Sequence, residues 1–407
     1  ITKIFRESLS HSFDDFRRDR RGSVVIEVNH GRAPAESSTP RTLRIAARQA
    51  DDLNMHIDPE VAIGNRLIGP NHDVYIIAEA GVNHNGDPSR ARALIDAAKQ
   101  ADADAVKFQV FSADRLVQPD APTCTYQQLS NPVEGGQREL LRKLELTAQC
   151  VTDLKQYADR IGIDFLATPF GVEEVQQLHE LGVTAIKIAS TDLVNTPLLL
   201  AAADTQRPII LSTGASLLPE IDKAVQLIRD RQTAERLILL HCVSAYPTQP
   251  AQARLRCIRT LARRFGVPTG FSDHTPNDDF STLAVAAGAV VLEKHLTLDR
   301  TERGPDHFFS LMPDQFARYV SCARKARTSL GDGQLTIAPE EIEVRKLARG
   351  SLTARCAIPT GQEITSGLLT VRRPSGGIEP QRWDDVLGRR AKIDIPANAP
   401  LAWSMLQ

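Results

Sequence analysis

The sequence predicts an α/β fold, namely a TIM (β/α)8 barrel followed by a small β-rich domain. Eight short apolar runs, rich in β-branched and aromatic residues, alternate with segments of helical periodicity over about 260 residues. This alternation is typical of parallel strands joined by crossover helices, and eight units of that total length match a closed barrel. A doubly wound open sheet is the competing architecture, but no Gly-x-Gly-x-x-Gly turn follows the first run.

The strands are expected at the apolar runs, in chain order. These runs are residues 74–79, 105–110, 163–169, 185–190, 208–214, 237–244, 267–274 and 290–295. Segments with the helical period lie between them, for example residues 90–99, 172–181 and 282–289. Each strand is therefore expected to be followed by a helix that returns the chain to the start of the next parallel strand.

Polar side chains gather where the predicted strands end. Parallel strands are buried on both faces, so Lys107, Lys187 and Glu293 within such runs cost free energy unless they are paired or functional. Active sites of these barrels lie at the carboxyl ends of the strands. One mouth is therefore expected to collect Glu79, Lys107, Gln109, Thr168, Lys187, Ser190, Ser212, Ser244, Ser272, His274, Glu293 and His295.

Two histidines are the most informative pair in the chain. His274 and His295 close the last two runs, so they are expected at matched depth on neighbouring strands, where two imidazoles could bind one ion. Two nitrogen ligands without cysteine suit Mn²⁺ or Zn²⁺, and open positions would leave a Lewis acid for a substrate carbonyl. The alternative interpretation is two satisfied core histidines.

The remaining polar residues have a consistent chemical sense. Two lysines and several hydroxyls suit a small substrate with a phosphate and a carboxylate. Glu79 and Glu293 are candidate acid/base groups, because burial can raise a carboxyl pKa towards neutrality. The alternatives are a structural ion pair with a neighbouring strand for Lys107 or Lys187, and ordinary turn chemistry for Thr168 and Ser190. The residues alone point to a metal-dependent barrel enzyme acting on an anionic small molecule.

Several motifs, taken in order, closely resemble those of the sialic acid synthase family. They are residues 76–87 (IIAEAGVNHNGD), 106–109 (VKFQ), 187–190 (KIAS), 211–214 (LSTG), 241–248 (HCVSAYPT), 270–275 (GFSDHT), 293–295 (EKH) and 304–311 (GPDHFFSL). The tail is similar to the antifreeze-like, or SAF, domain that ends these synthases, through residues 351–354 (SLTA), 358–365 (IPTGQEIT) and 372–378 (RRPSGGI). The resemblance implies a barrel catalytic domain at residues 55–330, a linker at 331–348 and an SAF domain at 349–407.

The resemblance also implies the reaction. Family members condense phosphoenolpyruvate with an open-chain N-acetylated amino sugar, such as N-acetylmannosamine, and water. They release phosphate and form a nine-carbon 2-keto acid. A different class of function, a non-catalytic sugar-binding or scaffold protein, is disfavoured because the charged residues and histidines are intact. A legionaminic or pseudaminic acid synthase, using a 2,4-diacetamido sugar, is an alternative that the shared motifs do not separate.

Residue roles follow from the same resemblance. His274 and His295 would bind a divalent metal, Mn²⁺ first, with Mg²⁺ or Co²⁺ as alternatives. The expected catalytic residues are Glu79, which would orient or deprotonate the attacking water, and Lys107, Lys187, Glu293 and Asp306. The expected substrate-binding residues are Gln109, Thr168, Ser190, Ser212, Ser244, Tyr246, Ser272 and Arg373. Within this set, the lysines and hydroxyls would hold the enol-phosphate, whereas Gln109, Tyr246, Glu293 and Asp306 would contact the sugar.

Arg373 implies a homodimer, because the family arginine reaches the sugar's N-acetyl group from the SAF domain of the partner subunit. The sequence departs from the family pattern at four positions. Asp102 and Ser375 stand where glycine is usual, Gly350 separates Arg349 from Ser351 and puts the role of Arg349 in doubt, and position 244 is serine where some members have asparagine.

Composition limits the partners and the compartment. The formal net charge is -1, so nothing draws the chain to nucleic acid or to a membrane surface. Six cysteines without paired spacing favour reduced thiols, and hence the cytoplasm. Residues 1–54 precede both the first methionine, Met55, and the family resemblance, and they lack the apolar core of a signal peptide. They are interpreted as an N-terminal extension, either upstream sequence or a disordered arm.

Overall fold

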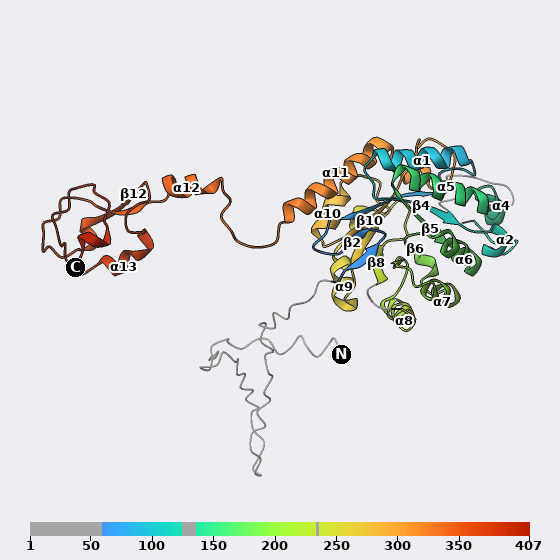
Figure 1. The fold of residues 1–407 in the computed structure, drawn as a ribbon, viewed down its shortest axis with the longest axis horizontal. Coiled ribbons are helices and arrows are strands. Elements are labelled where there is room, and N and C mark those ends of the chain that lie inside the picture. The colour runs from blue at the N-terminus through green and yellow to red at the C-terminus, as the bar shows by residue number, and fades with distance from the viewer. Residues whose placement is uncertain (1–58, 124–135, 233–235) are drawn as a thin grey trace, which may run out of the picture.

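The chain folds around a closed barrel of eight parallel strands in the order β10-β3-β4-β5-β6-β7-β8-β9 (Figure 1). The computed structural model describes residues 59–123, 136–232 and 236–407. The strands are β3 (Tyr75–Gly81), β4 (Ala105–Val110), β5 (Asp164–Pro169), β6 (Ile186–Ile188), β7 (Ile209–Ser212), β8 (Leu237–Cys242), β9 (Thr269–Asp273) and β10 (Val291–His295). The predicted TIM barrel is confirmed, and each strand falls inside or beside its predicted run.

Helices surround the barrel and alternate with the strands (Figure 1). They are α1 (Pro88–Gln100), α5 (Ala148–Ile161), α6 (Val172–Leu181), α7 (Thr196–Asp204), α8 (Leu218–Arg229), α9 (Arg256–Phe265), α10 (Phe280–Ala286) and α11 (Pro313–Leu330). Their ends follow local chemistry: the Asp87 carboxylate accepts from the Ser89 N–H at 2.8 Å, and Gly162 ends α5 in the left-handed region. None of the helices in the described ranges is both long and apolar enough to cross a bilayer.

Alternation along the strands separates two cores. In β3, Ile76 and Ala78 belong to the large core that includes the helices. Tyr75 and Ile77 belong to a second cluster that contains strand residues but no helix residue, which is the barrel interior. Successive side chains of a strand point to opposite faces, so residues that continue the inward series towards the carboxyl ends face the mouth. This period decides which polar residues enter the site.

A short hairpin closes the amino end of the barrel. It consists of β1 (Val61–Ile63) and β2 (Arg66–Ile68), which pair antiparallel. Ile63 and Ile68 are buried within the interior cluster, together with Tyr75 of β3. The sequence did not predict this hairpin, because two strands of three residues carry too little periodicity to be recognised.

Asp102 lies in the turn ahead of β4 with a φ of 61°. Here a non-glycine residue adopts the left-handed region, as expected at a position where glycine is usual, and a small backbone strain follows. The neighbouring Asp104 is buried and accepts from the Ile76 N–H at 2.8 Å. The turn is therefore tied to the first strand of the barrel.

The C-terminal part of the chain forms a small unit with its own core. The chain leaves the barrel at α11 and reaches this unit through α12 (Glu341–Ala348), as Figure 1 shows. Strands β11 (Ser351–Ala354) and β12 (Leu369–Arg372) pair antiparallel, and short turns complete the unit together with α13 (Trp383–Val386). Gly350 approaches β12 so closely that a Cβ there would lie 2.5 Å from Val371 Cγ1, which explains the glycine. The expectation for residues 1–54 lies outside the described residues.

Candidate active site

A cavity of about 440 Å³ opens at the carboxyl ends of the barrel strands. All of the barrel residues that the sequence singled out line it, and their chemical roles stay predictions. They are Glu79, Lys107, Gln109, Thr168, Lys187, Ser190, Ser212, Ser244, Tyr246, Ser272, His274, Glu293, His295 and Asp306. Arg373 follows β12, is exposed, and is not among the residues that line the cavity. The alternation of side chains along the strands therefore directs the predicted strand residues into this cavity.

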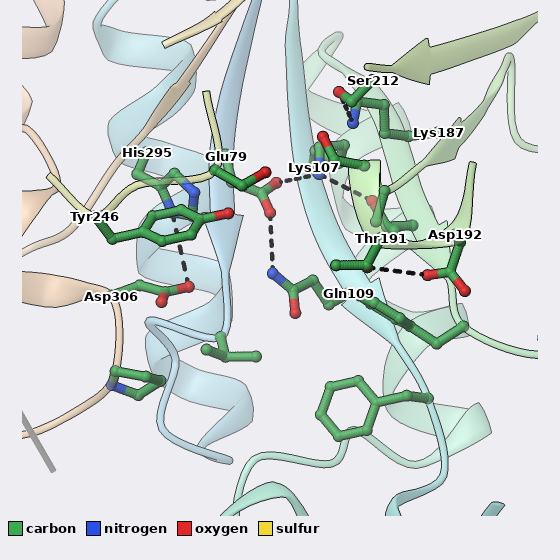
Figure 2. Close-up of a pocket in the computed structure, with 18 of the residues that line it drawn as sticks. Glu79, Lys107, Gln109, Lys187, Thr191, Asp192, Ser212, Tyr246, His295 and Asp306 are labelled. Atoms are coloured by element: carbon green, nitrogen blue, oxygen red, sulfur yellow. Dashed lines mark hydrogen bonds and ion pairs between the residues drawn. The ribbon is translucent and has the colours of Figure 1, made fainter. Parts of the chain in front are cut away.

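Two lysines and two glutamates, Lys107, Lys187, Glu79 and Glu293, form a charged floor among the residues that line the cavity. Figure 2 shows Glu79, Lys107 and Lys187. Lys107 Nζ lies 2.7 Å from Glu79 Oε2 and 3.7 Å from Glu293 Oε2. Lys187 Nζ lies 3.5 Å from Glu293 Oε1. Lys107 therefore makes the ion pair with a neighbouring strand that sequence alone offered as an alternative, but it makes this pair inside the cavity. Opposite charges alternate from Glu79 to Lys187, which makes burial of all four groups tolerable.

Hydroxyl groups orient these charges. Lys107 Nζ donates to Thr168 Oγ1 at 2.9 Å, and Lys187 Nζ donates to Ser212 Oγ at 2.8 Å. Ser272 Oγ donates to Glu293 Oε1 at 3.1 Å. Each hydroxyl comes from a strand next to the one that carries its partner, so closure of the barrel assembles the network.

The network drives the pKa values of the two glutamates in opposite directions. Burial raises the pKa of Glu79, with Lys107 opposing the rise and Glu293 adding to it. Burial also acts to raise the pKa of Glu293, but Lys107 and Lys187 together outweigh it and hold that pKa below its usual range. Burial lowers the pKa of Lys187, although Glu293 opposes this. Two carboxyl groups with separated pKa values are suited to different acid/base roles.

Beside the lysines, small hydroxyl groups converge on a glycine. The Gly214 N–H donates to Ser190 Oγ at 2.9 Å. A Cβ at Gly214 would lie 2.8 Å from Ser190 Oγ and 2.4 Å from Ser244 Oγ, so only glycine allows this approach. Ser244 Oγ is buried and has no hydrogen-bond partner within the described ranges. A buried polar atom left without a partner costs free energy, and a bound anion would remove that cost.

The two histidines face each other across the end of β9 and β10, with ring centroids 5.4 Å apart. His274 Nδ1 lies 3.0 Å from the Val243 carbonyl oxygen, which can only accept, so Nδ1 carries a proton. Burial acts to lower the pKa of His274, but Cys242 and the Val243 carbonyl together raise it above its usual value. His295 Nδ1 is buried without a hydrogen bond, and Asp306 Oδ2 lies 3.8 Å away (Figure 2). Burial, followed by the charge of His274, lowers the pKa of His295 well below its usual range, which favours a neutral ring.

These residues fit a divalent cation. Neutral imidazole is the form in which histidine binds metals, and the buried Nδ1 of His295 has no hydrogen-bond partner among the described residues. Within the part of the chain that the structure describes, no group of three or more His, Cys, Asp or Glu side chains is arranged to hold an ion. Water or substrate oxygens would therefore have to complete the coordination of a cation on His274 and His295.

Aromatic side chains pack against both histidines. The ring centroid of Tyr246 lies 4.4 Å from that of His274, and the centroid of Phe309 lies 4.8 Å from that of His295. Asp306 is buried beside them, and its pKa is raised to about 7 by burial and then by the charge of Glu79. Phe309 falls within the resemblance motif of residues 304–311 but was not singled out from the sequence.

Other cavity residues escaped the sequence interpretation. Thr191 and Asp192 directly follow the motif that ends at Ser190, and that position could have revealed them. Cys242 Sγ lies 3.7 Å from His274 Nδ1. A third group gives the cavity an apolar wall, largely from α2 (Ala113–Leu116), α4 (Gly136–Arg142) and nearby loops. Its members are Val82, Phe111, Leu116, Val117, Leu140, Leu141, Leu144 and Phe170. Residues in such loops carry no strand period that would mark them.

The fold and the site together define a (β/α)8-barrel protein with a charged, carboxyl-end cavity suited to an anionic ligand and a divalent cation. The NeuB family model matches residues 94–335, and the SAF domain model matches residues 349–407. The chain therefore belongs to the NeuB family, and the resemblance to the sialic acid synthases and their SAF domain is confirmed.

Named relatives place the chain within this family. It is 38% identical to the N,N'-diacetyllegionaminic acid synthase of Legionella pneumophila, over 83% of this chain and 96% of the relative. It is 33% identical to the N-acetylneuraminate-9-phosphate synthase of Mus musculus, over 84% of this chain and 94% of the relative. The solved N-acetylneuraminic acid (sialic acid) synthetase from Leptospira borgpetersenii has 37% identity and a TM-score of 0.64, covering 70% of this chain and 95% of that chain. The names differ in the sugar acid formed, so similarity alone leaves the sugar open.

Proposed function

We propose that this chain is a nonulosonate synthase. It would condense phosphoenolpyruvate with an open-chain N-acetylated amino sugar and water, giving a nine-carbon 2-keto acid and phosphate. The observation that carries the proposal is the cluster of charges in the cavity, where Lys107 and Lys187 alternate with two glutamates beside the pair of histidines. Membership of the NeuB family supports the same reaction.

The lysines and hydroxyls would bind the charged ends of phosphoenolpyruvate. Lys187 and the unpartnered Ser244 hydroxyl lie where a phosphate or carboxylate would gain charge-assisted hydrogen bonds. The two lysines are already balanced by Glu79 and Glu293, so this substrate would bring net negative charge into the cavity. A divalent cation would offset that charge, which gives the histidine pair a reason to lie beside the floor.

A divalent cation, Mn²⁺ first and Mg²⁺ or Co²⁺ as alternatives, would be held by His274 and His295. When bound, it would supply a Lewis acid for the sugar aldehyde. Gln109, Tyr246 and Asp306 line the cavity and would orient the sugar. Tyr246 and Asp306 lie beside His295, and Gln109 contacts Glu79 (Figure 2). Attack by the enol carbon on the aldehyde would leave a cationic carbon on the former enol.

Glu79 would then act on water. Its carboxylate is held by Lys107 at 2.7 Å and accepts from Gln109 Nε2 at 3.3 Å, so its orientation is constrained on both sides. Burial raises the pKa of Glu79, which makes it a stronger base than an ordinary glutamate once it is ionised. It would take a proton from the water that attacks the cationic carbon, and phosphate would leave when the resulting adduct collapses.

The apolar wall of the cavity favours a sugar without a phosphate group. Among the described residues that line the cavity, the only Lys or Arg side chains are Lys107 and Lys187, and both belong to the floor. Residues 124–135, which follow the loop of Phe111 and Leu116, contain no Lys or Arg in the sequence. Burying a phosphate against Val82 and Phe170 would be costly. We therefore favour an unphosphorylated sugar, either N-acetylmannosamine or a 2,4-diacetamido sugar as in a legionaminic or pseudaminic acid synthase.

A homodimer would complete the site. Arg373 is exposed on the SAF unit and does not line the cavity of its own chain, so we propose that it enters the cavity of a partner subunit. Its planar guanidinium suits the amide oxygen of an N-acetyl group. The connecting segment also exposes apolar side chains, including Leu335, Ile342 and Val344, which a partner surface would cover. The free cysteines among the described residues agree with a cytoplasmic protein.

The decisive experiment measures phosphate release from phosphoenolpyruvate with a panel of sugars and Mn²⁺. The panel contains N-acetylmannosamine, its 6-phosphate ester and 2,4-diacetamido sugars, and mass spectrometry identifies the acid formed. We expect release with at least one unphosphorylated sugar and a rate at least tenfold lower with the ester. No release with any sugar would contradict the synthase, whereas preference for the ester would contradict only the substrate class.

A further inference from the structure

A buried ion pair lies on the outer side of the barrel wall, directly behind the two histidines. Lys294 Nζ lies 3.2 Å from Asp273 Oδ2, and these side chains are 1% and 0% exposed. Asp273 immediately precedes His274, and Lys294 immediately precedes His295. The two residues are also direct partners in the ladder between β9 and β10. The ion pair therefore joins the two strands one position before both histidines.

The pair faces away from the cavity. The preceding outward residues, Phe271 of β9 and Leu292 of β10, pack in the core between barrel and helices, and side chains alternate along a strand. Lys294 Nζ lies 5.9 Å from the centre of the Tyr319 ring of α11. Neither Asp273 nor Lys294 lines the cavity, so neither is placed to touch a substrate there.

The same two side chains hold the turn that follows His274. Asp273 Oδ1 accepts from the Thr275 N–H at 2.8 Å and from Thr275 Oγ1 at 2.7 Å. Lys294 Nζ donates to the Thr275 carbonyl and contacts Thr275 Oγ1 at 3.2 Å. The backbone on either side of His274 is thus tied both to its own strand and to the strand that carries His295.

Stability alone does not account for this arrangement. Two buried charges lose their hydration, and apolar residues of similar volume commonly stabilise a core as well or better. A buried ion pair does, however, hold one register and one turn geometry, since any slip leaves both charges unpaired. Residues behind metal-binding histidines act in this way when they fix the orientation of the rings.

We propose that Asp273 and Lys294 are positioning residues for the histidine pair. They hold the ends of β9 and β10 so that His274 and His295 reach one cation together. This inference rests on the proposed function for the cation, and it adds two residues that touch neither substrate nor metal. Groups that hydrogen-bond to metal ligands commonly change metal affinity 10- to 100-fold when they are replaced, and we expect about tenfold here, because Asp273 and Lys294 act on the histidines through the strand ends.

The test is a double variant, Asp273→Leu with Lys294→Met, which removes both charges without leaving one of them unpaired. We expect its dissociation constant for Mn²⁺, measured by electron paramagnetic resonance of the free ion, to rise at least tenfold. We expect kcat to fall at least tenfold, while KM for phosphoenolpyruvate stays within about threefold of the parent value. Lys294→Arg, which keeps the ion pair, should recover most of the Mn²⁺ affinity.

A second ion pair, with a buried carboxylate and a partly exposed arginine, provides the control. Arg324 Nη2 lies 2.8 Å from Asp104 Oδ2 near the start of β4, at the other end of the barrel. The double variant Asp104→Asn with Arg324→Met should lower the melting temperature without changing Mn²⁺ affinity by more than about twofold. If Asp273→Leu with Lys294→Met does not fold, Asp273→Asn with Lys294→Met keeps the acceptor for Thr275 and serves instead.

The outcomes separate this inference from the proposed function. Unchanged Mn²⁺ affinity in the double variant, or an equal loss in the control, would overturn the positioning role. A parent protein that releases phosphate yet binds no Mn²⁺ would also overturn it, while the synthase would stand without its metal. If the parent binds Mn²⁺ and the double variant loses affinity as expected, but the parent never releases phosphate, the positioning role would stand and the proposed synthase activity would be refuted.

Discussion

The two ends of the barrel both bury charged residues, but they satisfy them differently. At the amino end, Asp104 accepts from the Ile76 N–H and from Arg324 through both carboxylate oxygens, each at 2.8 Å, and it also pairs with Arg66. At the carboxyl end, Ser244 Oγ and His295 Nδ1 are buried without hydrogen bonds to any residue that the structure describes. Completed networks at one end serve stability, and unmet groups at the other mark where a ligand would bind.

The largest effect is expected from the histidines. His274→Ala or His295→Ala should reduce kcat/KM by about a thousandfold or more, because two protein ligands are few and either loss would release the cation. Activity with Mn²⁺ after treatment with a chelator is the measurement, with Mn²⁺ binding followed in parallel. Full turnover of either variant after metal has been stripped would refute the metal site.

Glu79→Gln should follow, with kcat lowered about 100- to 1,000-fold and KM for phosphoenolpyruvate little changed. Glutamine keeps the shape of the side chain but cannot take a proton from water. Single-turnover phosphate release measures the effect, and thermal unfolding checks that the variant is folded. A decrease of less than tenfold would move the role of base to another residue and weaken the contrast between the two ends.

At the amino end of the barrel, a substitution should affect the free energy of unfolding more than the rate of phosphate release. Arg324→Met leaves Asp104 buried with less compensation, so the free energy of unfolding should fall by about 3 kcal/mol. The rate of phosphate release from the folded protein should stay within about twofold, because Arg324 is far from the cavity residues in the fold and does not line the cavity. Denaturant titration and steady-state kinetics together decide, and a tenfold loss of turnover would break the comparison.

The carboxyl end should also be the acid-sensitive one. Burial, then His307, lowers the pKa of His84 to about 4, so the ring stays neutral in the folded state and protonates more readily in the unfolded state. The neutral His84 ring contributes fully to the free energy of unfolding above a pH of about 6.5. This contribution, up to about 3 kcal/mol, is lost as the pH falls towards 4. Denaturant titrations at pH 7 and pH 5 measure the loss, and His84→Gln should flatten the dependence. An equal slope in that variant would refute the assignment.

Arg373→Ala should give the smallest effect, a rise of about tenfold in KM for the sugar with phosphoenolpyruvate binding retained. Mixing this variant with Glu79→Ala should restore part of the activity, since one hybrid site would carry both intact residues. Subunit exchange is verified by native mass spectrometry of the mixture. If exchange occurs and the mixture stays inactive, the site is not shared between subunits.

Most of the barrel was predictable because its signal is local. Each strand reads as a short apolar run, and the polar residue that follows it points to one mouth whatever the details of packing. Several runs extended past the strands themselves, since Ser190 and Ser244 follow β6 and β8 rather than belonging to them. The hairpin of β1 and β2 and the apolar wall were missed, because neither carries a period of useful length.

The closed barrel and the set of side chains that reach its mouth follow from local patterns in the chain. Period-two alternation places Glu293 and His295 inward, and parallel strands place their ends at one edge. Which charges meet depends on the folded barrel. Glu293 lies between Lys107 and Lys187, which come from strands far apart in the sequence, and Lys294 meets Asp273 behind the histidines. Such contacts arise when the barrel closes, so their distances and the separated pKa values of Glu79 and Glu293 have no local signature.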